Sequence, residues 1–234
     1  MEKRYRHEYK YRITAAEMAV LDMRAAMVLQ ADTHADGEGT YLIKSLYFDD
    51  YEDSCYWENE DGYNIRAKYR IRYYNNDTGC IRLEKKSKVN GMTHKDSCVI
   101  SMQQCKEFME GIIPMVTSDM PPMMQTLFTE MRLKKLVPKV IVIYERKPYV
   151  YGVGNVRITF DRNILSSNAI SEFLNETISA RPIMQKGESI LEVKWDELLP
   201  DYIREHLVLD SLQWTSFSKY YLCRKYDCYG GLNL

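Results

Sequence analysis

The amino-acid sequence predicts an α+β fold in which antiparallel β-strands close into a polar tunnel, with helices packed outside it. Segments of alternating polar and apolar residues recur along the chain, and turn residues separate several of them. Helical patterns interrupt these segments without alternating regularly with them. Arg, Lys and Glu recur at every second position of successive segments, so each predicted strand has one charged face.

The bulk composition is that of one ordinary globular domain, which we expect to span residues 1–234. The chain has 45% hydrophobic and 28% charged residues, and its formal net charge is −1. A chain of this length can bury a substantial core. The near-zero charge argues against a nucleic-acid-binding protein and means that any anion site must come from a local arrangement of charges.

The N-terminus predicts a cytoplasmic protein. It carries no apolar leader, and the longest apolar runs, such as residues 140–144, have only the length of a strand. We therefore expect neither a secretory signal nor a membrane segment. The six cysteines show no Cys-x-x-Cys spacing, so we expect reduced thiols and assign no metal to them.

The first predicted elements are a strand, a helix and a second strand. Residues 4–13 alternate charged with aromatic or apolar side chains, which predicts a strand. Thr14 and Glu17 have the capping-box spacing, and apolar residues follow at helical spacing. Asp36-Gly37 breaks the chain before a strand-like run over residues 40–48.

The remaining elements are mostly strands. A meander is predicted over residues 66–74, 80–88 and 95–101, with turns at 75–77 and 90–91, and helices follow at 102–111 and 122–135. The later elements are a hairpin of residues 140–151 and 156–161, a strand at 190–195, and helices at 198–206 and 218–225.

The charged faces of the predicted strands are rich in cations. The first strand carries Glu8 and Lys10 on this face. The faces of the later strands carry Arg66, Lys68, Arg70 and Arg72; Arg82, Glu84, Lys86 and Lys88; Arg157, Thr159 and Asp161; and Glu192 and Lys194. For a single strand, such a face is most simply solvated surface. Enclosing several of them would require carboxylates and a bound anion to neutralise the cations.

Two interpretations of this pattern stay open on the residues alone, a solvated sheet and a phosphate-binding tunnel. A closed barrel would place the charged faces inside and the apolar faces beneath the helices. The planar fork of Arg and the point charge of Lys both suit phosphate oxygens. The acidic residues Glu8, Glu84 and Glu192 suit a hard divalent cation.

Several short motifs follow one another in an order that is typical of one family. They are Glu8-Tyr9-Lys10-Tyr11, Tyr47-Phe48-Asp49-Asp50, Tyr69-Arg70-Ile71-Arg72-Tyr73, Leu83-Glu84-Lys85-Lys86, Tyr144-Glu145-Arg146, the run from Val156 to Asp161, Ile190-Leu191-Glu192-Val193-Lys194 and Phe217-Ser218-Lys219-Tyr220. In order and spacing, over about residues 4–225, the chain resembles the VTC domain, the polyphosphate polymerase domain of the triphosphate tunnel metalloenzyme superfamily.

The resemblance implies a metal-dependent polyphosphate polymerase that transfers the γ-phosphoryl group of ATP to a growing polyphosphate chain. It implies a catalytic role for Arg70, Arg72, Arg146 and Lys219. The implied phosphate-binding residues are Lys10, Arg70, Arg72, Lys86, Lys95, Arg146, Arg157, Lys194 and Lys219. The implied metal ligands are Glu192 and Glu8, for Mn²⁺ or Mg²⁺.

One position departs from the related tunnel hydrolases. Arg6 stands where their opening strand carries the first Glu of Glu-x-Glu-x-Lys, and the loss of this carboxylate argues against a two-metal hydrolase. A tunnel triphosphatase that hydrolyses tripolyphosphate or a nucleoside triphosphate, and a non-catalytic polyphosphate-binding module, are the alternatives. The expected partners are ATP and polyphosphate or triphosphate, with no nucleic acid. A membrane-bound partner chain and the oligomeric state are left open.

Overall fold

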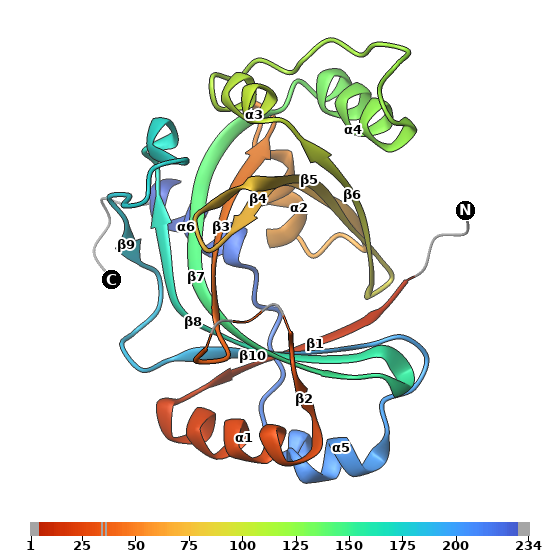
Figure 1. The fold of residues 1–234 in the computed structure, drawn as a ribbon, viewed down its shortest axis with the longest axis vertical. Helices are drawn as coiled ribbons and strands as arrows, with labels where there is room; N and C mark the ends of the chain where they lie inside the picture. Colours follow the sequence, from red (N-terminus) through yellow and green to blue (C-terminus); the bar gives the residue numbers. More distant parts are fainter. Residues whose placement is uncertain (1–4, 34, 36, 229–234) are drawn as a thin grey trace.

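The computed structural model describes residues 5–33, 35 and 37–228, and it is built around a strongly curved antiparallel sheet (Figure 1). The main strands lie in the order β1 (His7–Ile13), β10 (Ser189–Trp195), β8 (Val156–Ser167), β7 (Val137–Tyr151), β3 (Tyr41–Asp49), β4 (Ile65–Tyr74), β5 (Asp77–Val89) and β6 (Met92–Ile100). Two short strands extend it, β2 (Gln30–Ala31) beside β7 and β9 (Arg181–Pro182) beside β8.

The edge strands β1 and β6 meet at a single point. Arg6 and Thr93 exchange two backbone hydrogen bonds of 2.8 and 2.9 Å, and within the described residues no continuous ladder joins the two edges. Beyond this bridge, the chain that leads into the last helix pairs with β1, where Thr215 N–H donates to the Lys10 carbonyl at 2.9 Å. The sheet therefore curls around an interior without forming a fully hydrogen-bonded barrel.

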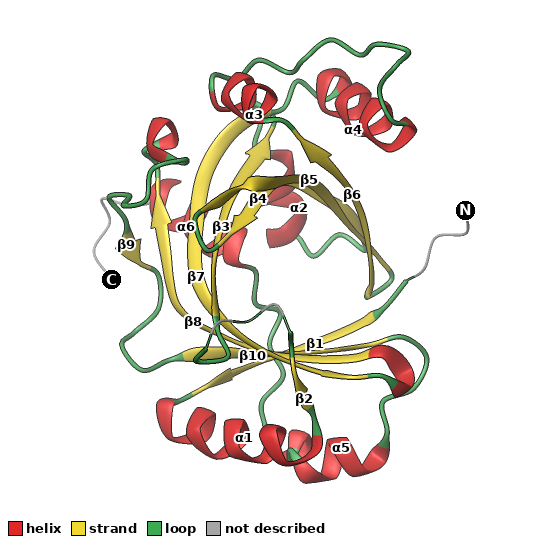
Figure 2. Ribbon diagram, in the orientation of Figure 1, coloured by secondary structure: helices red, strands yellow, loops and turns green. Residues whose placement is uncertain are grey.

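The helices surround this sheet (Figure 2). They are α1 (Ala15–Val28), α2 (Ser54–Glu60), α3 (Met102–Met109), α4 (Pro122–Leu133), α5 (Asp201–His206) and α6 (Lys219–Cys228), with short 3₁₀ turns at Val153–Asn155, Ile170–Glu172 and Leu209–Ser211. In the view of Figure 2, α1 and α5 lie below the sheet and α3 and α4 lie above it. In the described part of the chain, no helix is long and apolar enough to cross a membrane.

The predicted α+β class, the antiparallel strands and the order of the main elements are confirmed. The capping box predicted at Thr14 is present, because the Thr14 side chain accepts from the Glu17 N–H and the Glu17 carboxylate accepts from the Thr14 N–H. Residue 4 of the first predicted strand lies outside the described residues. The helix predicted from residue 198 begins only at Asp201, after Pro200, which fixes its own φ and lacks an N–H.

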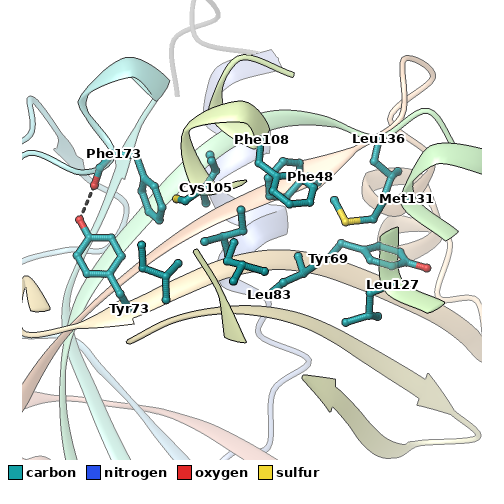
Figure 3. Packing of buried hydrophobic residues seen from close by; sticks show 14 of the residues in the cluster. Phe48, Tyr69, Tyr73, Leu83, Cys105, Phe108, Leu127, Met131, Leu136 and Phe173 are labelled. Carbon is teal, nitrogen blue, oxygen red and sulfur yellow. Dashed lines mark hydrogen bonds between the residues drawn. The ribbon is translucent and has the colours of Figure 1, made fainter. Parts of the chain in front are cut away.

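The apolar faces of the strands point outward and are covered by helices. Figure 3 shows Phe48, Tyr69 and Leu83 of three neighbouring strands in one apolar cluster with Phe108 of α3 and Leu127 of α4. On the other side, α1 and α5 cover apolar residues of β1, β8 and β10. Each fully buried large apolar side chain contributes roughly 1.5–3 kcal/mol. This outward burial sets the direction of the sheet, because the alternate, charged side chains must then face the interior.

Candidate functional site

The interior of the curled sheet holds a cavity of about 140 Å³ that is rich in cationic side chains. Side chains from β1, β4, β5, β7, β10 and the start of α6 line it, among them two carboxylates, Glu8 and Glu192. The ten basic residues that line it are Lys10, Arg66, Lys68, Arg70, Arg72, Lys86, Lys88, Arg146, Lys194 and Lys219. Charged faces of β1, β4, β5 and β10 that the sequence predicted therefore line one shared cavity.

A fully buried carboxylate, Asp161 of β8, holds two of the cations in place. The Arg146 guanidinium donates to both of its oxygens at 2.6 and 2.7 Å, and the Lys219 ammonium lies 2.5 Å from Oδ2. Burial raises the pKa of Asp161, but Arg146 and Lys219 outweigh this effect and lower it. Arg146 and Lys219 are thus held in fixed positions against the cavity without any ligand.

Glu84 of β5 plays the same part for the paired arginines of β4. Arg70 Nη2 lies 2.6 Å and Arg72 Nη1 3.8 Å from its Oε2 atom. The two guanidiniums also donate to tyrosine hydroxyls, Arg70 to Tyr47 at 2.9 Å and Arg72 to Tyr144 at 3.0 Å. Although burial raises the pKa of Glu84, the neighbouring arginines lower it strongly, so this carboxylate stays ionised.

Glu8 and Glu192 form the third group of carboxylates, shared among several lysines. Lys10 Nζ lies 3.0 Å from Glu8 Oε1 and 3.9 Å from Glu192 Oε1. Lys86 donates to Glu8 at 2.7 Å, and Lys194 lies 3.1 Å from Glu192. Burial raises the pKa of Glu8, but Lys86 and Lys10 outweigh it and hold that pKa at about 2. Both carboxylates are therefore anionic and adjacent.

These two carboxylates fit part of the coordination shell of a divalent cation. Both are oxygen ligands, which Mg²⁺ and Mn²⁺ prefer. Within the described residues, no group of three or more His, Cys, Asp or Glu side chains could hold a metal ion. A cation at Glu8 and Glu192 would complete its coordination with further oxygen ligands, and Mg²⁺ commonly takes these from substrate phosphates and water.

Two residues implied to bind phosphate do not line the cavity. The Lys95 side chain is 55% exposed, and its ammonium lies 3.2 Å from Glu84. Arg157 donates to Asp32 at 2.9 Å and to the Tyr41 hydroxyl at 2.7 Å. The other implied site residues, namely Lys10, Arg70, Arg72, Lys86, Arg146, Lys194, Lys219, Glu8 and Glu192, do line it.

Arg6, the position that departs from the tunnel hydrolases, is also bound outside the cavity. Its Nε atom lies 2.7 Å from Asp196 Oδ1. The guanidinium therefore adds nothing to the lining, and the carboxylate that the hydrolases carry there has no substitute at this position.

Sequence reasoning gave no site role to several lining residues. Arg66, Lys68 and Lys88 lie on the charged faces of β4 and β5, so the alternation of residues could have identified them. The irregular segment 214–218 also lines the cavity, and its Phe217 carbonyl accepts from Lys10 at 2.9 Å. No periodic signal marks this segment, and only the fold brings it to the site.

Comparison with known proteins agrees with this architecture. A family model described as VTC domain matches residues 5–226. The structure is similar to that of a candidate adenylate cyclase from Bacillus halodurans, with 12% identity, a TM-score of 0.54, and coverage of 98% of this chain and 99% of that one. It is also similar to a candidate adenylyl cyclase from Hippeastrum, described as having a dominant triphosphatase activity, with 13% identity, a TM-score of 0.54 and 95% coverage of both chains. At these identities the two structures establish the fold alone, which is that of the triphosphate tunnel proteins. No curated protein matches the chain.

Proposed function

Because the chain belongs to the VTC domain family, we propose that it is a metal-dependent polyphosphate polymerase. The reaction would transfer the γ-phosphoryl group of ATP to the end of a polyphosphate chain within the cavity. The observation that carries this proposal is the lining itself, in which ten cations and two carboxylates line one shared cavity. Such an arrangement suits a polyanion far better than a neutral or cationic ligand.

Phosphoryl transfer requires the protein to hold cations in position before the reaction begins. The transition state spreads negative charge over the transferring group, and fixed donors stabilise it without reorganisation. Arg146 and Lys219 are held by Asp161, and Arg70 and Arg72 are held by Glu84. In the proposed reaction these four cations would contact the transferring phosphoryl group and its neighbours.

The remaining implied residues would have supporting roles. Lys10, Lys86 and Lys194 would bind the other phosphates, while Lys95 and Arg157 would act only from outside the cavity lining. Glu8 and Glu192 would hold Mn²⁺ or Mg²⁺, which when bound supplies positive charge between neighbouring phosphates. The ATP donor also fits a cytoplasmic location, which we include in the proposal.

The proposed transfer needs no general base. A terminal phosphate oxygen of the acceptor chain is already ionised, so it can form the new P–O bond directly. The bond between the γ-phosphorus and the oxygen bridging to the β-phosphate breaks, and ADP leaves with that oxygen. The chain grows by one phosphoryl group, and no proton must be abstracted by the protein.

The test is to incubate the purified protein with ATP and Mn²⁺ or Mg²⁺ and to separate the products on a gel. We expect a ladder of polyphosphate together with ADP. An Arg146→Ala variant should form neither, whereas a Lys106→Gln variant, altered on the exposed side of α3, should match the unmodified protein. Orthophosphate and ADP without polymer would contradict the proposal and identify a triphosphatase instead. Polyphosphate binding without any product would identify a binding module.

A further inference from the structure

Three of the ten cations that line the cavity have no carboxylate within 4 Å in the described part of the chain. They are Arg66 and Lys68 of β4 and Lys88 of β5, which we call the carboxylate-free region. The other seven each contact Glu8, Glu84, Asp161 or Glu192. The cations that have no carboxylate partner are therefore concentrated at one end of the β4–β5 pair.

Two of these three residues, Arg66 and Lys68, donate hydrogen bonds to neutral groups. Arg66 donates to the Tyr63 carbonyl at 2.7 Å. Lys68 donates to the Asn59 amide oxygen at 2.8 Å and to the Ser218 hydroxyl at 2.7 Å. These hydrogen bonds position the two side chains without a carboxylate contact, and Glu58 acts on Arg66 only from beyond 4 Å, so an anion entering this end can pair directly with both cations.

The strand register makes the concentration of charge costly. Arg66 lies directly opposite Lys88, and Lys68 lies directly opposite Lys86. Like charges in such cross-strand positions destabilise a sheet. Burial, together with neighbouring cations such as Lys10 and Arg66, lowers the pKa of Lys68 well below its usual value. Burial likewise lowers the pKa of Lys88, and Arg66 adds to the effect. A bound polyanion would relieve both costs at once.

We propose that Arg66, Lys68 and Lys88, continued by Lys86, form a subsite for inorganic polyphosphate chains longer than a triphosphate, adjoining the transfer centre. The proposal deepens the proposed function and rests on it, because it places the acceptor chain along β4 and β5. Same-face residues of β4 run from Arg72 through Arg70 and Lys68 to Arg66 in one line. A chain leaving the transfer centre along this line would pass from compensated to uncompensated cations.

The geometry predicts discrimination by chain length. Same-face positions on a strand are roughly 7 Å apart, so Arg72 and Arg66 are separated by roughly 20 Å along β4. Successive phosphorus atoms share a bridging oxygen and are much closer together than 7 Å. A triphosphate held by Arg146, Lys219 and the paired arginines would therefore end before Arg66 and Lys88, whereas a longer chain would reach them.

The test is equilibrium binding of two probes, inorganic tripolyphosphate and long-chain polyphosphate, without ATP. In an Arg66→Gln/Lys88→Gln variant we expect the Kd for long-chain polyphosphate to rise about tenfold or more, and the Kd for tripolyphosphate to stay within about twofold. A matched Lys106→Gln/Lys134→Gln variant removes the same charge from exposed positions of α3 and the end of α4 and should change neither Kd.

The two probes separate failure of the subsite from failure of the proposed function. Equal weakening for both probes, or no weakening for either, would overturn the subsite. Thermal unfolding of each variant should occur at no lower temperature than that of the unmodified protein, which verifies that the Kd values report on folded protein. Length-dependent binding in a protein that makes no polymer would support the subsite while rejecting the polymerase.

Discussion

Two regions of one cavity contain the same types of basic residue but differ in whether carboxylates neutralise them. In the first, Arg70, Arg72, Arg146 and Lys219 are paired with the buried carboxylates Glu84 and Asp161. The second is the carboxylate-free region of Arg66, Lys68 and Lys88. There, Arg66 and Lys68 donate hydrogen bonds to neutral groups, and Arg66 lies directly opposite Lys88 on the neighbouring strand. In the first region buried carboxylates neutralise the cations, and in the second no carboxylate of the described residues lies within 4 Å of them.

The pKa values follow this difference. Arg70, Arg72 and Arg146 are desolvated, yet neighbouring anionic or ionisable groups such as Glu84, Tyr144 and Asp161 raise their pKa values. In Lys68 and Lys88, burial is opposed by much less negative charge, and the pKa falls. Fixed cations suit a transfer centre that must be organised before the reaction, and uncompensated cations suit attraction of a polyanion.

We expect the largest effect on stability when an ion pair is removed from the first region, in which the cations are paired with carboxylates. Among the residues that the structure describes, replacing Arg146 by Met leaves the fully buried Asp161 with only Lys219 as its ionic partner. Loss of one member of a buried ion pair costs about 3–5 kcal/mol, so we expect the free energy of unfolding to fall by that amount in urea titrations. An Arg146→Met/Asp161→Asn variant should recover part of the stability and none of the turnover. An unchanged unfolding curve for Arg146→Met would show that Asp161 is not a buried charge.

A second change affects catalysis more than stability. In Lys219→Met, Asp161 keeps its bidentate contact with Arg146, so the fold should be perturbed less than in Arg146→Met. Removal of one preorganised donor costs about 10²–10³ in turnover, and we expect a loss of that size in polymer formation from ATP. A variant that synthesises polymer at the normal rate would place the transfer centre away from Asp161.

A pH titration tests the role of Lys86, which lies at the boundary between the two regions. Burial lowers the pKa of Lys86 to about 8, although Glu8 raises it in part. Lys86 is therefore charged below about pH 8 and loses its proton above it, so polyphosphate affinity should fall as the pH rises from 7 to 9, by up to about tenfold per pH unit. Isothermal titration calorimetry across this range measures the effect. In Lys86→Arg, which stays charged, the fall should be smaller; an equally steep fall would assign the titration to another group.

The smallest effect has the opposite sign. In the carboxylate-free region, Lys88→Gln removes a like charge directly opposite Arg66. We expect the free energy of unfolding to rise by about 0.2–1 kcal/mol, seen as a small increase in Tm at low salt that disappears at high salt. A decrease in Tm would mean that Lys88 has a stabilising ionic partner, and the contrast with Arg146 would be lost.

Much of the fold could be predicted from local patterns. The capping box at Thr14, the turns of the β4–β6 meander and the alternation along β4 each depend on neighbouring residues. Helix α2 is not predicted from the sequence, because it is short. It begins after Asp53, and no sequence motif indicates the left-handed φ of 56° at this residue. The closure at the Arg6–Thr93 bridge joins residues far apart in the chain, and neither residue carries a local signal for it.

The candidate site shows the same division. Nine of the predicted site residues line the cavity, and seven of them share strand faces that alternation makes visible, whereas Arg146 and Lys219 were indicated only by the family motifs. Lys95 and Arg157 also alternate correctly, yet their side chains are engaged by Glu84 and by Asp32 outside the lining. Alternation specifies the face of a strand but not the partner that a long side chain finds there.

By itself, the sequence determined which side chains share a face, because the period of a β-strand does not depend on its surroundings. Only the tertiary structure decided that the charged faces look inward, since this required α1, α3, α4 and α5 to cover the apolar faces. It also decided which cations are neutralised: Lys219 meets Asp161 across 58 residues of sequence. Coulomb energy depends on distance in space and on burial, and the order of residues in the sequence specifies neither of them.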